Sequence, residues 1–209
     1  MSSLRNTALR GGPDYTGGAS GPVEDDALLD ALLDAARASI VAVGWKRSTL
    51  TDVARRAGVS RMTIYRRWPD MQTLVADLMT REWSGLADGP SAGNTLERLA
   101  QGVASTVSAL RANELFHKIV HVDPELLLPY LLERRGRTQD GLLALLEAGI
   151  TEGQRDGSVR DGDPTLLARS VLLTAHGFAL SAATMTDRRH PLTAFDDQLQ
   201  DLVEEYLRP

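Results

Sequence analysis

The chain is organised around residues Thr49 to Trp68, TLTDVARRAGVSRMTIYRRW. The hydroxyl of Thr49 can accept a hydrogen bond from the amide of Asp52, and a carboxylate at that position suits the positive end of a helix. Gly58 can end this helix, because a residue without a Cβ adopts positive φ without steric cost. Ser60 can then cap a following helix. The stretch therefore predicts a helix, a tight turn and a second, short helix.

The two predicted helices are apolar on one side and basic on the other. Val53, Ala54 and Ala57 recur at helical spacing in the first helix, and Ile64 faces inward in the second. Between Lys46 and Trp68 there are seven basic residues and one acid, a net charge of +6. Because the whole chain carries −5, the remainder carries −11. This asymmetry marks a local polyanion-binding surface on an otherwise acidic protein.

The second predicted helix has the size and chemistry to enter the major groove of DNA. It is short, basic and rich in hydrogen-bond donors, as recognition helices are. Charge alone leaves one alternative open, a structural helical hairpin with a solvated basic face. The candidate DNA-binding residues are Lys46, Arg47, Thr49, Thr51, Ser60, Arg61, Met62, Thr63, Tyr65, Arg66 and Arg67.

The run TLTDVARRAGVSRMTIYRRWPD resembles the DNA-binding motif of the tetracycline-repressor (TetR) family, and the similarity is strong from about Ala35 to Leu78. The matching residues are Thr49, Val53, Ala54, Ala57, Gly58, Val59, Ser60, Thr63, Ile64, Tyr65, Trp68 and Leu74. Met62 stands where the family often has a small residue, and Met71 where a lysine usually holds a phosphate. The resemblance implies a transcriptional regulator, in most cases a repressor, that binds a palindromic operator as a dimer.

The composition indicates a protein with a real core and no disulfide framework. The chain has 209 residues, 43% of them hydrophobic, and no cysteine. No signal peptide and no uninterrupted apolar run long enough to span a bilayer stands out, so we expect a soluble, cytoplasmic protein without a membrane partner. Residues 1–23 predict a flexible arm. Arg5 and Arg10 could enter a minor groove, or the arm could be a tail without a role.

The pattern along the chain predicts an all-α protein of about nine helices. We expect an N-terminal domain at residues 24–86, with the helix-turn-helix and a connecting helix, and a ligand-binding and dimerisation domain at residues 94–209. The segment 87–93, ADGPSAG, marks the boundary. Besides the helix-turn-helix, the expected helices cover residues 24–43, 70–86, 94–111, 114–122, 124–153 with a kink or a short lead-in turn near Pro129, 163–185 and 192–207.

By the resemblance, the C-terminal domain binds an effector and forms the dimer. The last two helices would pack against a symmetry mate through Leu172, Ala175, Ala179, Phe195, Leu199, Leu202 and Tyr206. The effector pocket would be lined by Val103, Val107, Phe116, His117, Val120, His121, His176 and Phe178. The region is rich in Leu, Ala and Val, which favours a small apolar effector. Ordinary helix packing, and a monomer whose core these two helices close, stay open as alternatives.

A metal site is the rival hypothesis. His117 and His121 stand four residues apart on one predicted helix, a spacing that can bind a metal in a helical enzyme or a metal sensor. The helical HExxH signature needs a glutamate where Lys118 stands, and no Ser/His/Asp order or paired-carboxylate motif stands out. We therefore expect a regulator that is not an enzyme, with no cofactor and no metal. Its partners would be double-stranded operator DNA, a small-molecule effector and a second copy of itself.

Overall fold

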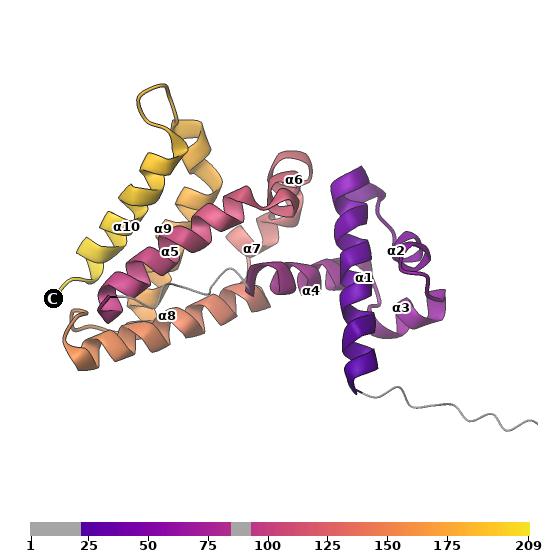
Figure 1. The fold of residues 1–209 in the computed structure, drawn as a ribbon, viewed down its shortest axis with the longest axis horizontal. Coiled ribbons are helices and arrows are strands. Elements are labelled where there is room, and N and C mark those ends of the chain that lie inside the picture. Colours follow the sequence, from indigo (N-terminus) through magenta and orange to yellow (C-terminus); the bar gives the residue numbers. More distant parts are fainter. Residues whose placement is uncertain (1–21, 85–92) are drawn as a thin grey trace, which may run out of the picture.

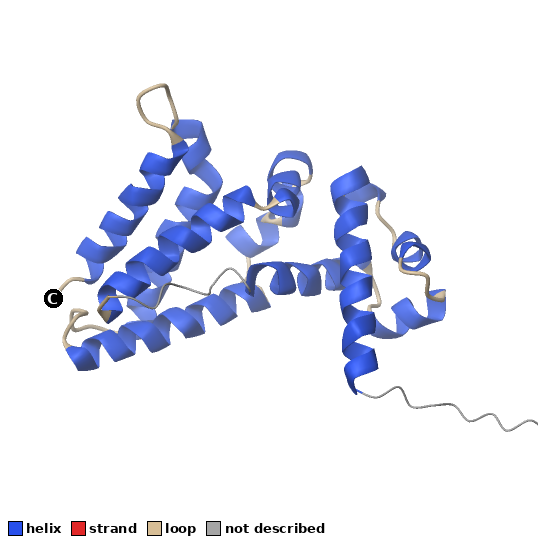
Figure 2. Ribbon diagram, viewed as in Figure 1, coloured by secondary structure: helices blue, strands red, loops and turns tan. Residues whose placement is uncertain are grey.

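The computed structural model describes residues 22–84 and 93–209, and in these ranges every regular element is a helix (Figure 2). The fold class is confirmed, with ten α-helices where about nine were expected. The α-helices are α1 Pro22–Val43, α2 Leu50–Arg56, α3 Arg61–Arg67, α4 Met71–Ser84, α5 Thr95–Ala112, α6 Glu114–Val122, α7 Leu128–Leu132, α8 Arg137–Asp156, α9 Pro164–Ser181 and α10 Leu192–Leu207. Short 3-10 helices lie at η1 Trp45–Arg47, η3 Pro124–Leu126 and η4 Ala182–Met185.

Side-chain caps form the helix-turn-helix as predicted. Thr49 accepts a hydrogen bond from the amide of Asp52 at 3.1 Å, and Ser60 accepts one from the amide of Thr63 at 3.2 Å. Gly58 has a φ of 71°, which allows the turn between α2 and α3. These contacts are local in sequence, and for that reason the boundaries could be derived from residue types alone.

The first hydrophobic core lies among α1 to α4 and includes α6. Ile40, Ile64 and Trp68 are fully or almost fully buried in it, together with Leu115 and Ile119 of α6. The expected domain boundary lies near residues 85–92, which fall outside the described ranges, as does most of the N-terminal arm. Helix α6, which follows these residues in the sequence, packs on the helices that carry the helix-turn-helix. Figure 1 shows α4 and α6 between α1 and the rest of the chain.

The second hydrophobic core joins α5, α8, α9 and α10. Ala100, Ile150, Ala168 and Leu199 are completely buried in it. These helices pack side by side at the end of the molecule opposite α1 to α3 (Figure 1). The molecule therefore has two hydrophobic cores, and α4 and α6 connect them.

Of the two forms expected for residues 124–153, one helix kinked near Pro129 is wrong, and the long helix that follows the lead-in begins only at Arg137. The segment contains η3, α7 and a turn before α8 begins at Arg137, because Pro124 and Pro129 each lack an amide and Gly136 starts the next helix. The amide of Gly136 donates to the side chain of Gln139 at 2.9 Å. Helix α8 also continues past Gly153 to Asp156, where Gly157 supplies the left-handed residue, with a φ of 79°, that ends it.

We expected no apolar run long enough to span a bilayer, and one segment of the chain departs from this expectation. The segment Pro164–Met185 is long and apolar enough to cross a membrane by length and composition, with a mean hydropathy of 1.4 in its best window. In the structure this segment packs in the second core through Leu167, Ala168 and Val171. Only 33% of the window is buried within the chain, so an apolar face remains on its outer side.

Candidate functional site

Helix α3 presents a donor-rich surface to solvent. Ile64 is completely buried and fixes the helix on the core, whereas Arg61, Tyr65 and Arg66 are exposed and Met62 is 79% exposed. This is the arrangement that the sequence predicted. It leaves three hydrogen-bonding side chains and one flexible apolar side chain on the same outer surface, where a major groove could meet them.

The basic residues of this surface differ in how far they are held by the protein. Arg67 is turned toward α1, where it pairs with Asp25 at 3.2 Å and lies over the ring of Trp68. The guanidinium groups of Arg61 and Arg66 make no ion pair or side-chain hydrogen bond with the described residues. These two arginines are therefore available to DNA, whereas Arg67 must first leave its carboxylate partner.

Two other basic candidates lie beside α2 rather than on α3. Lys46 pairs with Glu125 of η3 at 2.9 Å, and Arg47 donates to the carbonyl oxygen of Val43 at 2.9 Å. Both side chains are exposed. They lie before the helix-turn-helix and could contact the DNA backbone from there.

The hydroxyl candidates serve mainly to build the motif. The hydroxyl of Thr49 donates to Asp52 at 2.7 Å, and those of Ser60 and Thr63 share a hydrogen bond of 2.9 Å. The Thr49 hydroxyl, followed by the charge of Arg55, lowers the pKa of Asp52, so this carboxylate stays ionised at the positive end of α2. Thr51 is half-buried on α2.

A cavity of about 330 Å³ lies between α4, α5, α6, α7, α8 and α9. Of the predicted ligand-binding residues, those that line it are Val103, Val107, Phe116 and His176. His117, Val120, His121 and Phe178 do not line it. The lining also contains residues that were not predicted, among them Met79 and Trp83 of α4, Tyr130 and Leu131 of α7, and Leu142 of α8.

The position of α6 explains these errors. Phe116 points into the protein and is buried, so its neighbour His117 and the residue one turn later, His121, point to solvent. The apolar stripe of α4, which continues to Trp83, was a signal that this helix reaches the second half of the molecule. We expected this helix to connect the helix-turn-helix to the rest of the chain, but we did not predict that it lines the effector cavity.

The polar groups at the cavity are mostly engaged with the protein. Arg98 pairs with Glu152 at 3.1 Å, and Arg137 pairs with Asp77 of α4. Burial lowers the pKa of His176 below its ordinary value, so its imidazole is neutral at pH 7. The rest of the lining is largely aliphatic and aromatic, which suits an apolar ligand.

The predicted dimerisation set divides between the inside and the outside of the chain. Leu172, Ala175 and Ala179 line the cavity, and Leu199 is completely buried in the second core. Phe195 is half-buried. The exposed large apolar side chains on the last two helices are Leu166, Leu173, Leu202 and Tyr206, and the predicted set contains Leu202 and Tyr206. Periodicity predicted one apolar face on each of these helices but not whether the protomer or a partner covers it.

The metal alternative has no support. The rings of His117 and His121 lie side by side, 4.2 Å between centroids, on the exposed face of α6. Among the described residues, no group of three or more His, Asp or Glu side chains is placed to hold a metal ion. Two adjacent imidazoles fall short of the ligand set that a protein metal site uses.

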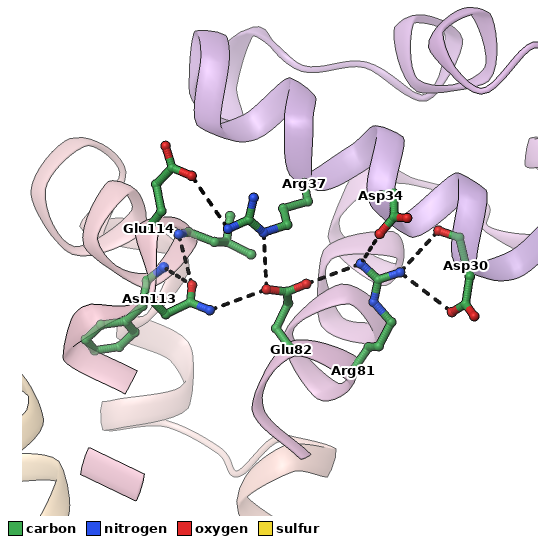
Figure 3. A network of polar contacts seen from close by, with 9 residues as sticks. Asp30, Asp34, Arg37, Arg81, Glu82, Asn113 and Glu114 are labelled. Atoms are coloured by element: carbon green, nitrogen blue, oxygen red, sulfur yellow. Dashed lines mark hydrogen bonds and ion pairs between the residues drawn. The ribbon is translucent and has the colours of Figure 1, made fainter. Parts of the chain in front are cut away.

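Glu82, near the end of α4, joins three helices in a polar network (Figure 3). Its carboxylate accepts hydrogen bonds from Arg37 of α1 at 3.3 Å and from the Asn113 amide, which caps α6, at 3.4 Å. The neighbouring Arg81 pairs with Glu82 at 3.2 Å. The remaining members of the network are Asp30, Asp34 and Glu114.

A second link runs from the end of α6 to the start of the helix-turn-helix. The carboxylate of Asp123, only 3% exposed, accepts a hydrogen bond from the amide of Trp45 at 2.7 Å. Gly44 allows this approach, because it has a φ of 84° and an added Cβ would lie 3.1 Å from the Asp123 oxygen. Both ends of α6 are thus bonded to the N-terminal half, and Phe116 in its first turn lines the cavity.

Comparisons with known proteins agree with this geometry. Residues 32–78 match the family model described as "Bacterial regulatory proteins, tetR family". An HTH-type transcriptional regulator of Mycobacterium bovis is 37% identical over 177 residues, which cover 84% of this chain and 92% of the relative. The fatty acid metabolism regulator protein of Bacillus subtilis is 23% identical over 180 residues, 82% of this chain and 91% of that protein.

The solved structures show the same fold. FadR from Bacillus subtilis in complex with stearoyl-CoA superposes with a TM-score of 0.61 at 20% identity, over 86% of this chain and 99% of that one. FadR from Bacillus halodurans gives 0.62 at 21% identity, over 90% and 97%. At these identities, the superpositions show that the helices are arranged in the same way and show nothing beyond the fold.

Proposed function

The chain belongs to the TetR family of bacterial regulatory proteins and is a helix-turn-helix transcriptional regulator, and from that premise we propose that it is a homodimeric repressor released from DNA by a fatty-acyl effector. The observation that carries the proposal is the double role of α4. This helix packs in the core of α1 to α4 through Leu74 and Leu78, and it lines the cavity through Met79 and Trp83. A ligand in the cavity therefore touches the helix on which the DNA-binding residues depend.

DNA recognition is assigned to α3. Arg61 stands at the start of the helix, where side chains of recognition helices meet base edges, and an arginine there prefers guanine. Tyr65 is exposed one turn later and suits a phosphate contact. Arg66 and the basic residues Lys46 and Arg47 supply charge for binding that does not depend on sequence.

Dimerisation is assigned to the outer faces of α9 and α10. Leu166 and Leu173 stand two turns apart on α9, and Leu202 and Tyr206 one turn apart on α10, all of them exposed in the protomer. A soluble monomer rarely leaves large apolar side chains gathered in this way. A two-fold dimer would place two α3 helices about 34–36 Å apart, one turn of DNA, and would match a palindromic operator.

The effector class is supported by the cavity and by two relatives. The cavity is lined mainly by aliphatic and aromatic side chains. A related regulator is named for fatty acid metabolism, and a structural neighbour is in complex with stearoyl-CoA. An acyl chain would lower operator affinity to the extent that it binds better to the conformation in which α4 and α6 have moved. We place the protein in the cytoplasm, where operator and acyl-CoA meet.

Two steps test the proposal. Selection of genomic fragments bound by the purified protein identifies the operator, which should be a palindrome. Titration of the operator complex with stearoyl-CoA should then release the DNA. A complex that keeps its affinity at saturating acyl-CoA would refute the effector assignment while leaving the DNA-binding assignment intact.

A pair of matched variants locates the effector site. Ala179→Phe fills the cavity and should bind operator normally but resist release, because the acyl chain has lost its space. Ala148→Phe makes the same change at an exposed position of α8 and should respond like the wild type. Equal behaviour of the two variants would place the effector outside this cavity.

A further inference from the structure

One buried donor at the cavity has no acceptor among the residues that the structure describes. The indole Nε1 of Trp83 is inaccessible to solvent, and it makes no hydrogen bond in the described structure. Leaving a buried N–H unpaired is costly, and native proteins avoid it in most cases. Another tryptophan of this chain follows that rule, because Nε1 of Trp68 donates to Asp77 at 2.7 Å. The unpaired indole N–H of Trp83 is an exception that a functional role would explain.

Trp83 stands at the wall of the cavity. Its ring lines the space and meets the ring of Phe116, also a lining residue, edge to face with 5.9 Å between centroids. The contact fixes the plane of the indole, so its N–H has a defined direction. Around it the lining is made of aliphatic residues such as Val107 and Leu110, which offer no acceptor from their side chains.

Several of the other polar side chains at the cavity already have partners. Gln139 accepts from the amide of Gly136 at 2.9 Å and donates to the carbonyl oxygen of Tyr130 at 3.1 Å. Thr138 shares a hydrogen bond of 3.1 Å with Thr80. The arginines that reach the cavity are ion-paired, as described above. Within the described lining, Trp83 is thus a buried donor that a ligand can bind without breaking a hydrogen bond of the protein.

We propose that Trp83 is the specificity-determining residue of the cavity, and that its indole N–H donates a hydrogen bond to a carbonyl oxygen of the ligand. The inference rests on the proposed function, because it requires that the cavity holds an apolar ligand. It adds that the ligand carries an acceptor along its chain, as an acyl group does. A hydrocarbon of equal length leaves the donor unpaired and binds more weakly.

Because Trp83 lies in α4, this hydrogen bond would act on a helix that is bonded to the DNA-binding half of the chain. The preceding residue, Glu82, is bonded to Arg37 of α1 and to Asn113 at the start of α6 (Figure 3). A ligand that binds Trp83 thus acts on the same turn of α4 that holds α1 and α6 together. Ligands that lack the acceptor would fill the cavity without making this hydrogen bond to α4.

The test compares 2-undecanone with undecane, two probes of equal chain length of which only the ketone has an acceptor. The wild-type protein should bind the ketone more tightly than the alkane. In Trp83→Phe, which keeps an aromatic ring against Phe116, affinity for the ketone should fall roughly 2- to 10-fold, the value of one net hydrogen bond. Affinity for undecane should be unchanged. Calorimetric titration measures both.

A spectroscopic measurement on the wild type avoids any effect of the variant on folding. The chain has three tryptophans, so its ¹⁵N–¹H spectrum shows three indole signals at most, and Trp83→Phe identifies one of them. That signal should move downfield with 2-undecanone and stay nearly constant with undecane. Equal shifts with the two probes, or equal losses of affinity in the variant, would overturn the role of Trp83 alone. Failure of both probes to bind would overturn the ligand cavity as well.

Discussion

The outer face of α9 offers the sharpest test of the dimer. Leu173 is 71% exposed in the protomer, whereas its neighbour Leu172 is buried at the cavity. Replacing Leu173 with glutamate changes a side chain that the protomer hardly uses. If this face meets a second copy, Leu173→Glu should therefore dissociate the dimer and leave each protomer folded.

The size of the effect follows from the exposed area of the leucine. Full burial of a leucine side chain contributes roughly 1.5–3 kcal/mol, so burying the remaining exposed part contributes about 1–2 kcal/mol per protomer. Two-fold symmetry doubles this to about 2–4 kcal/mol per dimer, or roughly 30- to 1,000-fold in the dimer dissociation constant. Two carboxylates forced into an apolar interface add a desolvation cost to this loss.

Sedimentation velocity over a concentration series measures the dissociation constant, and circular dichroism checks the fold. Leu132→Glu is the control, because Leu132 is 77% exposed on α7, away from the last two helices, and receives the same charge. It should dimerise like the wild type. Operator affinity should fall by orders of magnitude for Leu173→Glu only, while weak binding to any DNA persists at low salt.

Two outcomes would refute the argument. A wild-type protein that sediments as a monomer at micromolar concentration yet binds a palindromic site tightly has no need of the interface. A Leu173→Glu protein that dimerises normally places the interface elsewhere. The more obvious variant from the sequence, Leu199→Glu, cannot decide this, because Leu199 is completely buried within the protomer and its replacement should unfold the chain.

Three further predictions concern recognition, stability and pH. Arg61→Ala should cost about 1–3 kcal/mol on the operator and relax sequence preference, whereas Tyr65→Phe should weaken binding similarly on operator and scrambled DNA; equal losses on both DNAs for Arg61→Ala would exclude base reading. Asp123→Ala removes the buried acceptor of the Trp45 amide and should lower the free energy of unfolding by about 1.5–3 kcal/mol, measured in urea; an unchanged midpoint would contradict the link. Since burial lowers the pKa of His176, the unfolded chain binds this proton more readily, so stability should fall as pH drops below about 6.5; His176→Phe should show a shallower fall between pH 6.5 and 5 in thermal unfolding.

The helix-turn-helix could be derived from residue types because its determinants are local. The caps at Thr49 and Ser60, the glycine turn at Gly58 and the inward Ile64 are each set within a few residues of one another. The same holds for the capping box at Asn94 and for the first and last residues of α10. Local geometry limits these choices before any other helix is present.

The cavity and the outer face of the last two helices were beyond this kind of inference. Leu172 and Leu173 are equally apolar neighbours, yet one lines the cavity and the other is exposed. His117 and Phe116 likewise point to opposite sides of α6. Periodicity finds apolar faces on a helix, but it does not say whether a face is covered by another helix of the chain, by a ligand or by a second copy. That depends on where α4, α7 and α8 come to lie, and their packing is a property of contacts between residues far apart in sequence.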